Sequence, residues 1–345
     1  MEMAMPEPTA YDQFLLELIN KARANPTAEA SRLGINLNQG LNAGQISTAP
    51  KQPLAFNGDL VDAAHKHSKW MLDTDTFSHT GAGGSSFTAR MKAEGYVFSG
   101  SWTAGENISW GGTTGTVNQL THTQARHDGL FKSPGHRVNI LNDNFKEVGT
   151  GVEFGKYGVY NASMVTEDFA KSGTASFITG VAYDDRNDNN FYTPGEGRGG
   201  IKVSAVSTGT ANPVTVTDLT GAAGGYDIAV APGTYKVTFS EGGLAAPITR
   251  TVTVGSKNVK IDLIDPPSAA VAAQVAGVSA SAADALDFKA LAGTAVSQPA
   301  AHHVETGRHG WDHGHDAAPV PVDYAHAMMA LIGVPDGHHQ DALAA

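Results

Sequence analysis

The pattern of apolar residues changes near residue 173, and this change most constrains what the chain can fold into. Before it, apolar residues recur at helical spacing, as in "YDQFLLELINKARANP" and "NGDLVDAAHKHSKWMLD". After it, short runs rich in Val, Ile and Thr follow one another closely, separated by Gly and Pro. We therefore predict two folded regions of different class, residues 1–172 and residues 173–265.

Residues 1–172 combine helical patterns with two strand patterns, which predicts an α+β fold built in layers. Two further helices are expected in "SSFTARMKAEGY" and "TVNQLTHTQARHDGLFK", and strands in "KEVGTGVEFG" and "GVYNASMVTEDFA". Asn57 is the expected N-cap of one helix, and Ser85 or Ser86 that of another. Pro26 is expected to end the first helix and Gly95 the third.

Residues 173–265 hold seven short strand patterns at fairly regular intervals, which is typical of an all-β sandwich. Residues 266–345 begin with "PPSAAVAAQVAG", which has the composition of a linker. The last 44 residues hold eight of the 14 histidines. We expect this third region to be a disordered tail, with weak, adventitious affinity for transition metals.

Charge and composition exclude several classes of function. The net charge of −11 argues against nucleic acid and anionic membranes as partners. Without cysteine, the chain has no disulfide, no thiolate nucleophile and no thiolate metal site. No apolar stretch approaches 18 residues, so no transmembrane segment is expected. The N-terminus lacks the basic and apolar regions of a Sec signal peptide.

Three polar motifs, "FSHTG", "GENIS" and "SPGHR", each place one side chain that can ligate a metal beside a predicted turn. These side chains are His79, Glu106 and His136. Two imidazoles and a carboxylate can hold Zn²⁺ with one position open. The same three groups can also act as an acid–base set without a metal.

The order of motifs from "PLAFNGDLVDAAHKHSKWM" through "FSHTG", "GENIS" and "SPGHRVNIL" to "EDFA" resembles the CAP superfamily in its bacterial SCP-like form. The resemblance covers about residues 11–170. It implies an α–β–α sandwich whose cleft carries two histidines and two acids and often binds zinc. His79, Glu106 and His136 match the motif positions. The second family glutamate is absent, and His127 or Asp128 is its nearest substitute.

A second cluster of oxygen ligands lies in "DRNDNNFYTPGE". Its spacing is that of an EF-hand loop, with calcium ligands predicted at Asp185, Asn187, Asn189, the Phe191 carbonyl and Glu196. The alternative is an acidic, Asn-rich turn between strands. The surrounding sequence, residues 174–265, resembles the SdrD B-like and Cna B-like β-sandwich modules of bacterial surface proteins, which implies a structural calcium ion.

Three functions remain open at this point. The CAP-like cleft can bind a small molecule, such as a lipid, glycan or peptide. It can alternatively act as a metal-dependent peptidase or esterase, with Glu106 as general base. A third possibility is a purely structural surface protein. The absent second glutamate favours binding. An SCP-like protein with a calcium module, no Sec signal peptide and no cysteine resembles the bacterial proteins secreted by a type I route. The resemblance implies an extracellular location and an uncleaved export signal, which we expect in residues 320–345.

Overall fold

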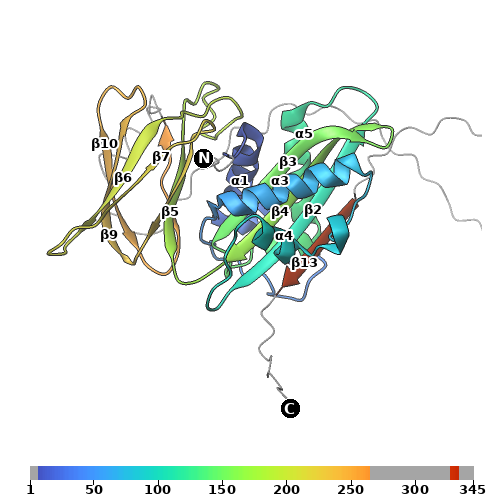
Figure 1. Ribbon diagram of the computed structural model, residues 1–345, viewed down its shortest axis with the longest axis horizontal. Helices are drawn as coiled ribbons and strands as arrows, with labels where there is room; N and C mark the ends of the chain where they lie inside the picture. Colours follow the sequence, from blue (N-terminus) through green and yellow to red (C-terminus); the bar gives the residue numbers. More distant parts are fainter. Residues whose placement is uncertain (1–6, 265–326, 334–345) are drawn as a thin grey trace, which may run out of the picture.

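A computed structural model of the protein describes residues 7–264 and the strand at residues 327–333. An α+β part, which extends to Lys171, lies beside a β-rich part that starts at Ser176 (Figure 1). This agrees with the change of pattern that the sequence shows near residue 173.

The α+β part is built on a five-stranded sheet in the order β1-β3-β4-β2-β13. The short β1 runs parallel to β3, and the other neighbours are antiparallel. The strands are β1 (Ala55–Phe56), β2 (Thr103–Thr113), β3 (Glu147–Tyr157), β4 (Tyr160–Lys171) and β13 (Ala327–Gly333).

Helices cover both faces of this sheet. The helices α3 and α4 pack on one face, and α1, α5 and α6 on the other. They are α1 (Ala10–Ala24), α2 (Pro26–Arg32), α3 (Gly58–Asp73), α4 (Phe87–Ala93), α5 (Gln119–Lys132) and α6 (Pro134–Ile140). The backbone of α3 touches that of β3, because a Cβ on Gly149 would lie only 2.0 Å from the carbonyl carbon of Leu60.

The helix ends largely follow the local signals in the sequence. The Asn57 side chain accepts hydrogen bonds from the backbone of α3, and Ser86 does so for α4. Gly95 follows α4 with φ of 115°, a conformation that favours glycine. Pro26 ends α1 as expected but also begins α2, a helix that the periodicity did not predict, because proline suits the first turn of a helix.

All seven predicted strand patterns of the second region form strands, the last one divided into β11 and β12. One sheet has the order β10-β9-β6-β7, and in the other β5 pairs with β8, β11 and β12. Residues of both sheets share one apolar core, including Ile228 and Phe239. The strands are β5 (Ser176–Tyr183), β6 (Ile201–Thr208), β7 (Thr215–Leu219), β8 (Gly225–Val230), β9 (Gly233–Glu241), β10 (Ile248–Val254), β11 (Val259–Lys260) and β12 (Leu263–Ile264).

The two parts contact each other through α1. Phe14 and Leu18 of α1 pack in one apolar cluster with Val181 and Tyr192 of the β-rich part. An ion pair of 2.9 Å between Glu17 and Lys260 lies at the same junction. The β-rich part is therefore packed against the α+β part through a buried contact.

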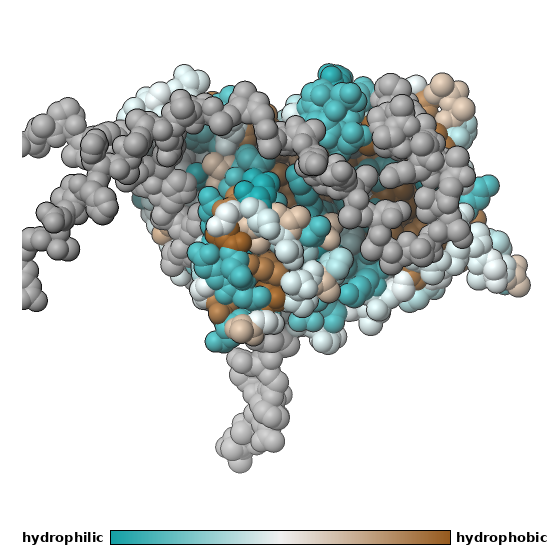
Figure 2. Space-filling model, turned by 180° about the vertical axis from the view of Figure 1, so that it is seen from behind, coloured by the Kyte–Doolittle hydropathy of each residue, from teal (hydrophilic) through white to brown (hydrophobic). Residues whose placement is uncertain are grey.

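The tail departs from its prediction in one place. Residues 327–333, expected to be disordered, form β13 at the edge of the α+β sheet, drawn red in Figure 1. The predicted linker and nearly all of the His-rich stretch lie outside the described residues. On the face in Figure 2, hydrophilic and hydrophobic residues are interspersed. The most exposed large apolar side chains of residues 7–264 are single ones, such as Val97 at 73% and Val159 at 78%.

Candidate functional site

A buried histidine–carboxylate pair forms the centre of the candidate site. His79 follows α3 in a loop, and Glu106 lies in the middle of β2, not beside a turn as its motif suggested. Nδ1 of His79 is 2.6 Å from Oε1 of Glu106, whose side chain is fully buried. Nε2 of His79 is buried and has no hydrogen-bond partner among the described residues. The carboxylate therefore orients the ring and leaves Nε2 available.

Arg90 of α4 holds the other oxygen of this carboxylate. Its guanidinium forms a close ion pair with Oε2 of Glu106. The same side chain donates hydrogen bonds of 3.0 Å to the carbonyl oxygens of His79 and Ser85. Both oxygens of Glu106 are thus engaged, and the loop that carries His79 is tied to α4.

A second acid lies beside Glu106, and the sequence analysis missed it. Asp168 of β4 is directly opposite Glu106 in the β2–β4 register, so the two side chains point to the same face of the sheet. Both are fully buried. Burial, and then the charge of Glu106, raise the pKa of Asp168 well above its usual range. This shift favours the protonated form of Asp168, and neither of its carboxyl oxygens has a hydrogen-bond partner among the described residues.

His67 borders this group from α3. It is 1% exposed, stacks on Trp70 and lies 3.0 Å from the carbonyl oxygen of Ser78 through Nε2. Burial lowers its pKa to about 4, so the ring is neutral at physiological pH. These contacts give His67 a structural role in the core.

His136 lies on the other side of the sheet, in the first turn of α6. Its Nδ1 is 2.7 Å from the hydroxyl of Ser133. The Asn107 side chain, next to Glu106 on β2, donates to the carbonyl oxygen of His136 at 3.3 Å and to Glu167 at 2.9 Å. Asn139 donates in turn to Asn107 at 2.9 Å. A buried polar layer thus fixes α6 against β2 and β4.

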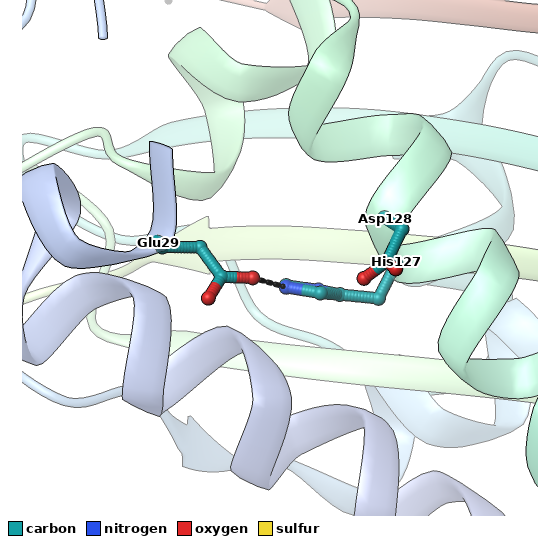
Figure 3. Close-up of side chains that lie close together, drawn as sticks. All are labelled: Glu29, His127 and Asp128. Atoms are coloured by element: carbon teal, nitrogen blue, oxygen red, sulfur yellow. Dashed lines mark hydrogen bonds and ion pairs between the residues drawn. The ribbon is translucent and has the colours of Figure 1, made fainter. Parts of the chain in front are cut away.

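His127 and Asp128, the predicted substitutes for the missing acid, lie on α5 in a separate cluster with Glu29 of α2 (Figure 3). Within residues 7–264, this is the one group of three His, Asp or Glu side chains with ligand atoms all within 4.8 Å of each other. The residues His79, Glu106 and His136 do not form such a group here.

A positively charged side chain, that of Arg32, already lies in this second cluster. Arg32 bonds to both oxygens of Glu29 and to Asp128, and Nε2 of His127 is 3.0 Å from Glu29. Burial acts to raise the pKa of Glu29, but the hydrogen bonds from His127 and Arg32 outweigh it and lower the pKa to about 2. The cluster is an ion-pair network that joins α2 to α5.

The predicted calcium loop has its side-chain oxygens turned inward. The Asp185 carboxylate accepts hydrogen bonds from the backbone of Asn189 at 3.0 Å and of Asn190 at 2.7 Å. The Glu196 carboxylate, at the last loop position, accepts from the backbone of Arg186 at 3.2 Å and of Thr193 at 2.8 Å. Asn190, where an EF-hand has glycine, has φ of 55°. This donor set suits a hard divalent cation.

The loop also contacts helix α1 of the α+β part. The Phe191 ring meets that of Phe14 edge to face, with centroids 6.1 Å apart, and Lys21 lies 5.0 Å above the same ring. Tyr192 is 1% exposed in the junction cluster. The loop that would bind calcium therefore forms part of the contact with α1.

Comparison with known proteins agrees with the α+β architecture and its motifs. Residues 16–169 match the model of the CAP family, described as the cysteine-rich secretory protein family. The matched residues span most of the α+β part of the chain. A comparison with curated proteins finds no match.

Two solved structures are similar to parts of the chain. An extracellular protein containing an SCP domain from Bacillus anthracis str. Ames is 25% identical, with a TM-score of 0.32. The match covers 47% of this chain and 40% of that one. An outer surface protein from Borrelia burgdorferi is 14% identical, with a TM-score of 0.32, over 49% of this chain and 97% of that one. Among the described residues, no helix is both long and apolar enough to cross a membrane.

Proposed function

We propose that this chain is an extracellular binding protein whose CAP domain holds a lipid, glycan or peptide beside a zinc ion at the His79 site. The observation that carries the proposal is the buried Nε2 of His79, which has no protein partner while Nδ1 contacts Glu106. An imidazole held by a carboxylate at one nitrogen is a common zinc ligand at the other. The family description as secretory supports an extracellular location, with type I export as part of the proposal.

In this proposal, His79 binds the metal through Nε2. Glu106 does not touch the metal and orients the His79 ring through Nδ1. His136, expected from its motif to be a second ligand, lies across the sheet and is not grouped with His79 and Glu106, so His79 is the one protein ligand assigned here. Bound zinc would act as a Lewis acid toward an oxygen or nitrogen of the ligand. The protein residues orient the imidazole, neutralise Glu106 through Arg90 and place the buried acid Asp168 next to it.

The alternative activity, hydrolysis with Glu106 as general base, has less support. A general base needs a carboxylate oxygen free to take a proton from water. Both oxygens of Glu106 are engaged, by His79 and by Arg90. Binding therefore fits the geometry better than turnover does.

The test is the zinc content of the full-length chain. Wild type is compared with His79→Ala, and with His122→Ala as a control, after dialysis against excess zinc and then against buffer. The tail histidines contribute equally to all three proteins. We expect His79→Ala alone to lose one zinc per chain. Equal zinc content in all three proteins would contradict the proposed metal site, and hydrolysis abolished by a chelator would support the alternative.

We also propose that the loop from Asp185 to Glu196 binds one calcium ion with a structural role. The inward carboxylates and the positive φ of Asn190 support this assignment. Because Phe191 and Tyr192 of the loop pack at α1, calcium would stiffen the junction between the two parts. Isothermal titration with calcium should give one site in wild type, and the absence of binding heat would contradict this.

A further inference from the structure

The strand β2 has one edge that would be open without the tail. Its other edge pairs with β4 over its full length. The open edge pairs antiparallel with Ala327–Gly333, from Ala104↔Gly333 to Trp110↔Ala327 (Figure 1). An unpaired strand edge presents backbone donors and acceptors that readily accept another strand. The edge of β2 is therefore a strand-accepting surface.

The stretch of β2 that pairs with β13, Ala104–Trp110, includes Glu106 of the candidate site. Leu331 of β13 is the register partner of Glu106 on β2. The helix α6, which carries His136, lies next to both β2 and β13. A strand at this edge therefore lies beside both the strand that carries Glu106 and the helix that carries His136.

The present occupant indicates what kind of strand this edge accepts. The sequence of residues 327–333, "AMMALIG", has no charged residue and no hydrogen-bonding side chain. In strand addition, main-chain hydrogen bonds provide affinity, and alternate side chains provide specificity. The matching ligand is an extended, uncharged, apolar peptide.

The occupant is also distant along the chain. About 60 residues, 265–326, separate it from Ile264, and the entropy cost of closing a loop rises with the logarithm of its length. The tether gives the internal strand a limited effective concentration at the edge of β2. A free peptide strand at a comparable concentration can therefore compete with it.

We propose that the edge of β2 is a binding site for extended apolar peptides, and that Ala327–Gly333 occupies it as an internal competitor. This inference deepens the proposed function by choosing a peptide among the ligand classes, and it rests on that function for the role of the site. The pairing itself is made by backbone groups and does not need the metal.

The test uses the full-length protein and a fluorescent synthetic peptide with the sequence of residues 324–336. Proline removes a backbone donor, and alternate residues of an edge strand direct their N–H groups toward the neighbouring strand. One variant carries Met328→Pro and Ala330→Pro, and the other carries Met329→Pro and Leu331→Pro. In one of these variants the removed N–H groups face β2, and in the other they face away from it. The second variant is therefore the matched control for introducing two prolines.

We expect the peptide to bind at least tenfold more tightly to one of the two variants than to wild type. Hydrogen exchange at Ala104–Trp110 should be faster in that variant and slow again when the peptide is added. Equal peptide affinity for wild type and both variants, or the absence of binding to all three, would overturn the inference. Each titration is repeated with a chelator and in the His79→Ala background.

These arms separate the two proposals. Peptide binding that persists in His79→Ala, together with unchanged zinc content, would remove the metal site and keep the strand site. Loss of one zinc in His79→Ala, with no peptide binding to any variant, would overturn the strand site alone.

Discussion

Replacing one buried acid should make this protein more stable at neutral pH. Glu167 of β4 is fully buried on the face toward α5, and one of its oxygens accepts a hydrogen bond of 2.9 Å from Asn107. The other oxygen has no hydrogen-bond partner among the described residues. Burial raises its pKa from 4.5 to about 7, against the effect of the Asn107 hydrogen bond. At pH 6 the folded protein therefore keeps this acid protonated, whereas the unfolded chain ionises it.

The direction of the pH effect follows from proton binding. Between the unfolded pKa of 4.5 and the folded pKa of about 7, the folded state binds more protons than the unfolded state at Glu167. Its contribution to stability is fully present below 4.5 and is lost as the pH rises through 7. One pKa unit corresponds to about 1.4 kcal/mol, so this loss amounts to about 3 kcal/mol.

The substitution Glu167→Gln removes this titration and keeps an acceptor for Asn107. We expect the free energy of unfolding of the variant to lie within about 1 kcal/mol of wild type at pH 4.5, the cost of one altered hydrogen bond. At pH 8 the variant should be more stable by up to about 3 kcal/mol. Urea unfolding followed by circular dichroism, from pH 4.5 to 8, measures both.

The control is Glu241→Gln, which removes a carboxylate whose side chain is 63% exposed. Its difference from wild type should stay nearly constant with pH. If the difference between wild type and Glu167→Gln also stays constant from pH 4.5 to 8, the carboxyl is not held protonated by burial, and the reasoning fails.

Three further predictions follow from the same structure. Glu196→Gln should abolish the rise in melting temperature with calcium, which for wild type corresponds to about 2.7 kcal/mol at 100 times the dissociation constant. Gly149→Ala should lower the melting temperature strongly, because overpacking against the α3 backbone costs about 3 kcal/mol or more. Burial lowers the pKa of His65, but hydrogen bonds to Asp12 and Glu153 outweigh it and raise the pKa to about 10. His65→Gln should therefore destabilise the protein at pH 6, and thermal melts should show the difference shrinking toward pH 10.

The periodic helices and the strands of the second region were predictable because each has a one-sided apolar pattern and clear turn or cap signals. The strand β2 was not. Its sequence, "TAGENISWGGT", is buried along nearly its whole length and so lacks alternation between apolar and polar residues. Its glycines resemble turn signals, but a Cβ on Gly111 would lie 2.0 Å from the guanidinium of Arg126. Close packing explains that glycine.

The candidate site was predictable only in part for a related reason. The motifs located His79 and Glu106, and the structure pairs them. The expected substitutes for the second acid, His127 and Asp128 in the helix before "SPGH", bond with Glu29 and Arg32 instead. The acid beside Glu106 comes from another strand. Strand register places Asp168 there, and register depends on pairing that a single sequence does not contain.

The strand β2 connects the features described above, because successive side chains of a strand point to opposite faces. Glu106 points toward α3 and α4, where it holds His79. Asn107 points toward α5 and α6, where it holds Glu167 and the backbone of His136. The backbone groups of the same residues, on the side away from β4, pair with β13. A ligand strand that orders this edge therefore also orders the support of both histidines, which is why hydrogen exchange along Ala104–Trp110 reports on the site as well as on the strand.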